Sequence, residues 1–236
     1  MMTEVKGTRN DVFHLYELYL MAEATGNDTI FGLPDKSVYA ITDPHYLDAA
    51  KEAIQEKGIL NEEGHISDGG FFVIKAIQEY ATSRKYVQIN NLMIAFSESE
   101  PDELIVLTEI ENQSYYQIKV MDKVLVLKDL FDSVAIVQRE PLADEKEFTL
   151  KKLRNRERRS ILEEEIEENV LSLAVFDTET VQTDTKFAQW LYFMEEDKLC
   201  TVNVEEEAYY RVSQYWLMKE LFDSLEIPYP QETEEK

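Results

Sequence analysis

Few residues of this 236-residue chain have the types and spacing that catalysis or metal binding requires. The three histidines, His14, His45 and His65, lack the three- or four-residue spacing that brings two imidazoles to one metal ion. The single cysteine, Cys200, cannot form an internal disulfide or seed a cysteine-rich zinc site. No glycine-rich phosphate loop and no paired nucleophile and base are recognisable. We therefore expect no catalytic residue, no metal and no cofactor, and a protein that is not an enzyme.

A basic segment is the first feature that could mediate binding. Six of the 24 Lys and Arg residues lie within 151–159, and a glutamate run at 163–168 follows on the same expected helix. This order opposes the helix macrodipole, so helix energetics alone would not select it. A solvated helix with an Arg159–Glu163 pair explains it without a function. The alternative is a basic surface for an acidic partner, or for the protein's own acidic body. Its residues would be Arg154, Arg156 and Arg158.

An aromatic segment is the second candidate. Residues 187–194 are apolar on both alternations, so a strand there must be buried on both faces. A central strand, covered by helices on one side and by the other half of the chain on the other, explains this pattern. The alternative is a surface that a partner helix covers, because aromatic residues and Met anchor interfaces. The candidate partner-binding residues are Trp190, Tyr192 and Met194, extended by Tyr215, Trp216 and Met218 on the last expected helix.

Hydrophobic spacing predicts the elements that carry these residues. The second and third helices are expected to bury Leu47, Ala50 and Ile54, and Phe72, Ile74 and Ile77, respectively. Helices are expected at about 11–24, 44–57, 68–83, 122–132, 147–170 and 213–225. Strands are expected at about 86–96, 103–110, 115–120, 134–137, 171–176, 187–194, 198–204 and 209–212.

The order helix, antiparallel strands, helix occurs twice along the chain. Residues 115–118 match 209–212 and residues 128–134 match 219–225, at offsets of 94 and 91, which favours a duplicated unit. The predicted fold class is therefore α+β, with two quasi-repeated halves that form a central antiparallel sheet flanked by helices. The expected halves are residues 1–138, with an N-terminal helical segment, and residues 139–236, which hold the basic/acidic helix, the C-terminal helix and an acidic tail. We expect one compact pseudo-twofold body.

Charge narrows the classes of partner. The chain has 48 Asp and Glu against 24 Lys and Arg, a formal net charge of −24, and this field repels nucleic acid and anionic lipid. The helix, turn, helix, strand order at 44–85 resembles a winged-helix DNA reader, but that segment lacks the basic face such a reader needs. No stretch has the uninterrupted apolar core of a signal peptide or a membrane span. We expect a cytoplasmic protein with no nucleic-acid partner and no stable membrane insertion.

One segment resembles a known family. Residues 47–94, with Lys57-Gly58-Ile59-Leu60, Gly64, the following helix and Tyr86-Val87-Gln88-Ile89-Asn90-Asn91-Leu92, resemble the opening of the EspG-like, EsaE-type proteins of type VII secretion. The resemblance implies a quasi-symmetric α+β body. It also implies a cytoplasmic chaperone or adaptor that binds an ESX, WXG100 or LXG-type substrate or toxin and keeps it soluble for export. The implied partners are a helical-hairpin substrate or toxin targeting domain and a secretion ATPase. The loops at 111–114 and 195–197 are shorter than the loop with which mycobacterial members hold substrate.

A second functional class competes with the chaperone. An acidic immunity or regulatory protein that binds a basic toxin domain has the same charge and the same lack of catalytic residues. Truncation of the partner separates the two hypotheses, because a chaperone engages the helical targeting region and an immunity protein engages the toxic domain.

Overall fold

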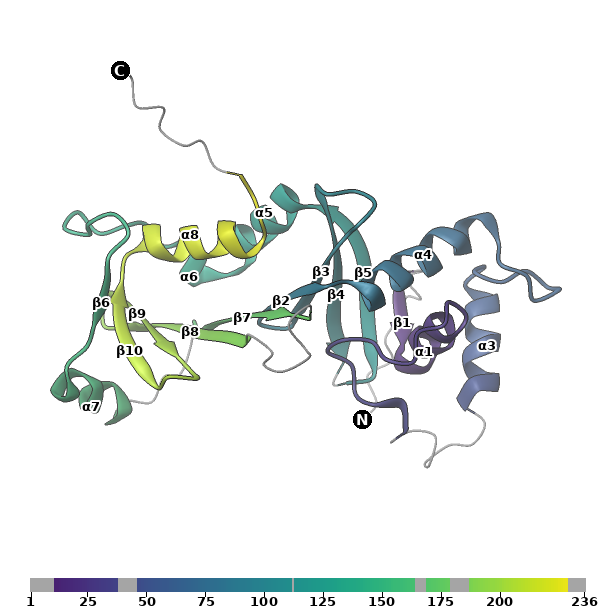
Figure 1. Cartoon of the computed structure of the whole chain (residues 1–236), viewed down its shortest axis with the longest axis horizontal. Helices are drawn as coiled ribbons and strands as arrows, with labels where there is room; N and C mark the ends of the chain where they lie inside the picture. The colour runs from purple at the N-terminus through teal and green to yellow at the C-terminus, as the bar shows by residue number, and fades with distance from the viewer. Residues whose placement is uncertain (1–10, 38–45, 112, 164–168, 179–186, 229–236) are drawn as a thin grey trace, which may run out of the picture. The chain divides into compact units, whose positions relative to one another are not determined.

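The computed structural model describes residues 11–37, 46–111, 113–163, 169–178 and 187–228 (Figure 1). The chain divides into two compact units: unit 1 takes its residues from 1–84 and 91–120, and unit 2 from 85–90 and 121–236. Both combine α-helices with antiparallel strands, and a helix lies near the N-terminus. The predicted α+β class is confirmed. The boundary between the two halves was expected at 138/139, whereas residues 121–138 belong to unit 2. The pseudo-twofold relation stays a prediction.

The described residues of unit 1 form four strands and three helices. In spatial order the strands are β1 (Val12–His14), β5 (Tyr115–Asp122, of which 121 and 122 belong to unit 2), β4 (Glu103–Glu111) and β3 (Leu92–Phe96). The helices are α1 (Leu15–Glu23), α3 (Tyr46–Glu56) and α4 (Asp68–Thr82). Phe13 lies opposite Tyr116, and Ile94 lies opposite Val106. Because α4 contacts both β3 and β4, it is the helix that covers this sheet segment.

Side-chain caps determine where the helices of unit 1 begin. At α1, the His14 ring nitrogen accepts from the Tyr16 N–H at 3.3 Å, and the Glu17 carboxylate accepts from the His14 N–H at 2.8 Å, which is a capping box with histidine as the cap. Lys57 forms an ion pair with Glu17. Burial, aided by the Lys57 charge, lowers the pKa of His14 against the opposing effect of Glu17, so the ring stays an acceptor. At α4, Ser67 Oγ accepts from the Gly70 N–H at 2.9 Å.

The described residues of unit 2 form six strands, and neighbouring strands pair antiparallel. In spatial order they are β2 (Lys85–Ile89), β7 (Leu171–Asp177), β8 (Phe187–Glu195), β9 (Lys198–Asn203), β10 (Ala208–Val212) and β6 (Leu150–Lys152). The helices are α5 (Lys123–Ser133), α6 (Ala135–Gln138), α7 (Asn155–Glu163) and α8 (Gln214–Ser224). Figure 1 shows α8 and α6 on one side of these strands and α7 on the other.

The repeat seen in the sequence recurs in the elements. β5 leads into α5 through the cap Asp122, and β10 leads into α8 through the cap Ser213; each helix has 11 residues. The matched segments 128–134 and 219–225 contain equivalent ion pairs between residues four apart, Lys128–Asp132 and Lys219–Asp223. Each half also has a three-residue strand that precedes a helix and pairs with the equivalent strand of the repeat. In the first half β1 pairs with β5, and in the second half β6 pairs with β10. The quasi-repeated order of helix, antiparallel strands and helix is therefore confirmed.

Three expected elements are wrong. Residues 86–96 form two strands, because Asn90 adopts a left-handed backbone (φ 52°) that Asn tolerates, and the chain turns there. Residues 134–137 were expected as a strand, but 135–137 lie in the helix α6 and Val134 is its N-cap, since a short apolar run does not distinguish strand from helix. The expected helix 147–170 holds strand β6 and the nine-residue α7. The start of the helix expected at 44–57, with His45, lies outside the described residues, as do residues 164–168 of the glutamate run and the acidic tail 231–236.

The predicted burial of two residues is also wrong. Leu47 is 37% exposed and Phe72 is 71% exposed. The inward faces of their helices are instead Tyr46, Ala50 and Ile54 on α3, and Gly70, Ile74, Ile77 and Tyr80 on α4. A shift of one or two positions moves a residue by 100° or 200° around a helix, and contact with α1 sets which face turns inward.

Candidate protein-binding surfaces

The aromatic strand β8 is buried on both faces at its centre. Tyr192 and Phe193, which are neighbours and point to opposite faces, are both fully buried. Phe193 packs with Cys200 and Val202 of β9 and with Ile161 of α7. The predicted burial on both faces is confirmed at these two positions. The Phe193 face is covered by α7 of the same half of the chain, and cover by the other half stays a prediction. Of the proposed partner-binding residues, Tyr192 therefore has no accessible surface in this structure.

Helix α8 covers Tyr192 with polar groups. Trp216 and Glu220 of α8 and Thr201 of β9 surround the Tyr192 hydroxyl, and burial raises its pKa. Burial also raises the pKa of Glu220. Among the residues that the structure describes, neither the Tyr192 hydroxyl nor the Trp216 ring N–H has a hydrogen-bond partner. The structure thus brings Tyr192 and Trp216 together as an interior contact.

The other proposed aromatic residues lie nearer the surface. Trp190 and Met194 are half-buried, and the Trp190 ring lies 6.0 Å from the ring of Tyr210. Met218 is half-buried, while Tyr215 is 40% exposed in the first turn of α8. A partner could contact Tyr215 directly.

The basic residues divide into two kinds. Arg154, just before α7, and Arg156 are exposed. Arg158 instead packs on its own unit, with its guanidinium carbon 5.1 Å from the centre of the Tyr209 ring and a guanidinium nitrogen 3.5 Å from a carboxylate oxygen of Glu207. One of the three therefore contacts the acidic body of the protein, and two face solvent. The side chain of Glu163 lies outside the described residues, so the Arg159–Glu163 pair stays a prediction.

A pocket in unit 1 is a site that the sequence interpretation missed. It has a volume of about 260 Å³ and lies between α4, the turn that joins β3 to β4, and the faces of β4 and β5. Its apolar lining consists of Phe72, Ala76, Ile105 and Val120. Its polar lining consists of Lys75, Glu79, Ser97, Ser99, Glu100 and Glu103. We call these residues the α4 pocket.

The polar wall of the α4 pocket is organised around one carboxylate. Glu79 accepts from Ser97 Oγ at 2.6 Å and from Ser99 Oγ at 2.8 Å, and Lys75 Nζ lies 3.3 Å from it. Burial by itself would raise the pKa of Glu79, but these hydrogen bonds outweigh burial and hold the pKa below its ordinary value. Glu79 is therefore ionised at neutral pH, and its oxygens are occupied by groups of the protein itself.

The size and lining of the α4 pocket suit a protein side chain. Pockets for drug-sized ligands usually occupy about 300–1,000 Å³, and this pocket is smaller. In the sequence, the adjacent residues Phe71 and Phe72 at the start of α4 were the feature that could have indicated this pocket. Adjacent residues are about 100° apart on a helix, so a core-facing stripe through Ile74 and Ile77 leaves much of this pair outside.

Metal centres, reactive thiols and membrane spans are further features that could define a function. Within the described ranges, no group of three or more His, Cys, Asp or Glu side chains is placed to hold a metal ion. Cys200 is buried, and burial raises the pKa of its thiol to about 12. None of the described helices has the length and apolar character needed to cross a bilayer.

Comparison with known proteins places the chain in a family. Two curated relatives from Staphylococcus aureus, of strains USA300 and NCTC 8325 / PS 47, are both named type VII secretion system protein EsaE and are 28% identical over 110 residues. The match covers 47% of this chain and 49% of each relative, so the chain spans about half the length of the curated relatives it matches. A family model matches residues 7–233, nearly the whole chain. The chain therefore belongs to the family described as domain of unknown function DUF5081.

Proposed function

We propose that this chain is a type VII secretion-associated protein that acts as a cytoplasmic chaperone or adaptor. It binds a helical secreted substrate or the targeting domain of a toxin, keeps it soluble and delivers it for export. The observation that carries the proposal is the similarity to EsaE, whose name assigns that protein to the type VII secretion system. The chaperone role and a kinship with EspG-like proteins in particular are the further part of the proposal.

The surface chemistry supports binding rather than catalysis. Unit 1 exposes Phe71 and Phe72 beside the α4 pocket, and aromatic side chains of this kind anchor protein interfaces. The net charge of −24 keeps the protein soluble while it holds an apolar partner. Binding alone stabilises the bound state of a substrate by mass action, so no chemical step is needed.

Co-expression tests the proposal. The chain is produced together with each small helical secreted protein and each toxin encoded beside it, and the products are analysed by size-exclusion chromatography with light scattering. We expect one of them to co-elute with the chain at a one-to-one mass. Separate elution of every candidate would contradict the proposal.

An immunity or regulatory role is the second candidate, and the net charge of −24 favours it because many toxin domains that act on nucleic acid are basic. The same co-expression with truncated toxins decides between the two roles. Retention by the helical targeting region alone supports the chaperone, whereas retention by the toxic domain alone supports the immunity protein.

A further inference from the structure

We propose that the α4 pocket, together with the acidic turn 97–103 beside it, binds an amphipathic helix that inserts one large apolar side chain and flanks it with Lys or Arg. This inference rests on the proposed function for the helical nature of the partner. The position of the pocket and the chemistry of the flanking residues come from the structure alone.

The apolar part of the surface is large and unusually exposed. Phe72 is 71% exposed, Phe71 is 57% exposed, and their ring centres lie 5.9 Å apart. Across the pocket, Val120 of β5 is 49% exposed and Ile105 of β4 is buried. Exposed apolar groups that surround a hollow mark interaction sites more often than scattered ones do. The pocket thus has an apolar wall at which Phe72 stays largely uncovered among the described residues of unit 1.

The hydrogen-bonded part of the polar wall, around Glu79, does not select the ligand. Ser97, Ser99 and Lys75 already bond with Glu79, so their hydrogen-bonding capacity is used within unit 1. A polar ligand would have to break these bonds to gain new ones. An apolar side chain leaves them intact, and a volume of about 260 Å³ holds one large side chain rather than a drug-sized molecule.

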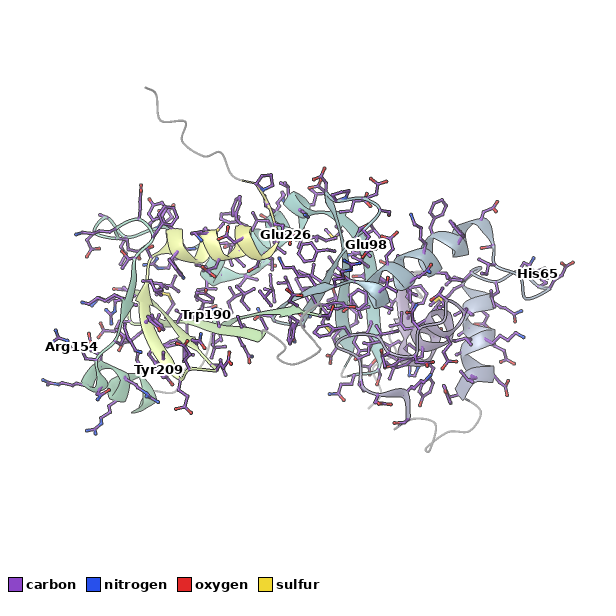
Figure 2. All side chains as sticks on the ribbon, in the orientation of Figure 1. His65, Glu98, Arg154, Trp190, Tyr209 and Glu226 are labelled. Atoms are coloured by element: carbon purple, nitrogen blue, oxygen red, sulfur yellow. The ribbon has the colours of Figure 1, made fainter. Side chains whose placement is uncertain are left out.

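The acidic turn supplies the charge selection. The sequence Ser97-Glu98-Ser99-Glu100-Pro101-Asp102-Glu103 carries four carboxylates. Glu98 lies 3.6 Å from Arg84 (Figure 2). Within the described part of the chain, no Lys or Arg forms an ion pair with Glu100, Asp102 or Glu103. These three carboxylates therefore favour a cation on the partner, close to the residue that enters the pocket.

A single helix can supply both an apolar side chain for the pocket and a cation for the acidic turn. Residues three or four apart lie on one helical face, about 5–6 Å from each other. A helix with an apolar residue and a Lys or Arg at such a spacing can fill the pocket and reach the acidic turn. A helix with Glu in place of Lys meets repulsion from the same carboxylates.

A synthetic peptide tests this without any secretion substrate. The probe is an amphipathic helical peptide with one Trp and with Lys four residues before and after it; the second probe has Glu at both Lys positions. Fluorescence anisotropy of a labelled peptide measures binding to the full chain. We expect the Lys probe to bind at least about tenfold more tightly than the Glu probe. Equal binding of the two probes would overturn the charge argument.

Matched variants locate the site. Phe72→Ala should weaken binding of the Lys probe about tenfold, whereas Phe131→Ala, which removes another exposed Phe from α5, should leave it unchanged. The triple change Glu100→Gln, Asp102→Asn and Glu103→Gln should weaken binding and flatten its salt dependence. The control E205Q/E206Q/E207Q changes the net charge equally on the exposed turn between β9 and β10 and should have no such effect. Parental binding by Phe72→Ala and by the acidic-turn variant would exclude this pocket.

The two proposals fail separately. Probe binding that depends on Phe72, with no secreted substrate found by co-expression, supports the pocket and counts against the type VII role. A co-expressed substrate that binds the Phe72→Ala variant as well as the parent supports that role and excludes the pocket as the substrate site. Circular dichroism of every variant verifies its fold.

Discussion

At the scale of single residues, two adjacent glycines show how closely α4 is packed. A Cβ atom at Gly70 would lie 2.2 Å from the carbonyl oxygen and 2.8 Å from the carbonyl carbon of Ile59, whereas a Cβ atom at Gly69 would have no neighbour within 4 Å. Because the obstacle is backbone, it cannot move aside as a flexible side chain does. The approach of α4 to the segment that precedes it therefore requires Gly at position 70.

Gly70→Ala should lower the free energy of unfolding by about 1–3 kcal/mol, since overpacking forces the backbone to shift. Gly69→Ala in the same helical turn is the control, and its effect should be neutral or stabilising by less than about 1 kcal/mol, because Ala favours helix over Gly. Urea unfolding followed by circular dichroism measures both variants. Equal stability of the two would contradict the close contact with Ile59.

At the scale of elements, one carboxylate connects α6 to α8. Glu145 is paired with Arg139 and accepts from the Gln214 N–H at the start of α8 at 3.0 Å. Gln214 Nε2 in turn donates to the carbonyl oxygens of Ile136 and Val137 at 3.1 and 3.0 Å. Burial alone would raise the pKa of Glu145, but the hydrogen bonds from Arg139 and Gln214 hold it below its ordinary value of 4.5. The segment that follows α6 is thereby attached to the helix that covers β8.

Glu145→Gln should lower the free energy of unfolding at pH 7 by about 1–3 kcal/mol, because the half-buried Arg139 loses its counter-ion. As the pH falls below about 4.5, the unfolded state takes up a proton at Glu145 before the folded state does, so this contribution is lost. The variant and the parent should therefore converge in stability at acid pH. Glu147→Gln, at an exposed position nearby, is the control. A pH-independent difference between Glu145→Gln and the parent would contradict the ionic account.

At the scale of the whole molecule, the dominant property is repulsion between its own charges. A formal net charge of −24 in 236 residues opposes the compact state. Salt reduces this repulsion, since the Debye length falls from about 30 Å at 0.01 M to about 8 Å at 0.15 M. The same screening weakens attraction to a basic partner, so stability and binding should respond to salt in opposite directions.

Raising NaCl from about 0.01 M to about 0.15 M should raise the Tm of the chain, as measured by differential scanning calorimetry. E205Q/E206Q/E207Q has three fewer negative charges, and its Tm should rise less over the same range. A Tm that falls with salt, or an equal rise for both proteins, would show that attractive ion pairs outweigh the net repulsion.

The local sequence pattern was sufficient to predict some helices and strands and insufficient to predict others. The helices at 15–23, 68–82 and 123–133 were predicted because apolar spacing and caps such as Ser67 act within a few residues. The strand at 150–152 was not predicted, because β6 exists only through its pairing with β10, where Lys151 lies opposite Arg211. At β6, the hydrogen bonds to β10, a strand some 60 residues away in the sequence, outweigh the local helical propensity.

The sequence by itself determined the fold class, the duplicated order of elements and the acidic character, because periodicity, repeated words and net charge are local or additive properties. Only the tertiary structure decided that Tyr192 is interior, that α6 lies with α8 and that Phe72 borders a pocket. Burial of a residue depends on which distant segment packs on its face. Phe72 and Tyr192 are both large aromatic residues, so residue type does not separate them. Long-range packing places Phe72 at the surface and Tyr192 in the core.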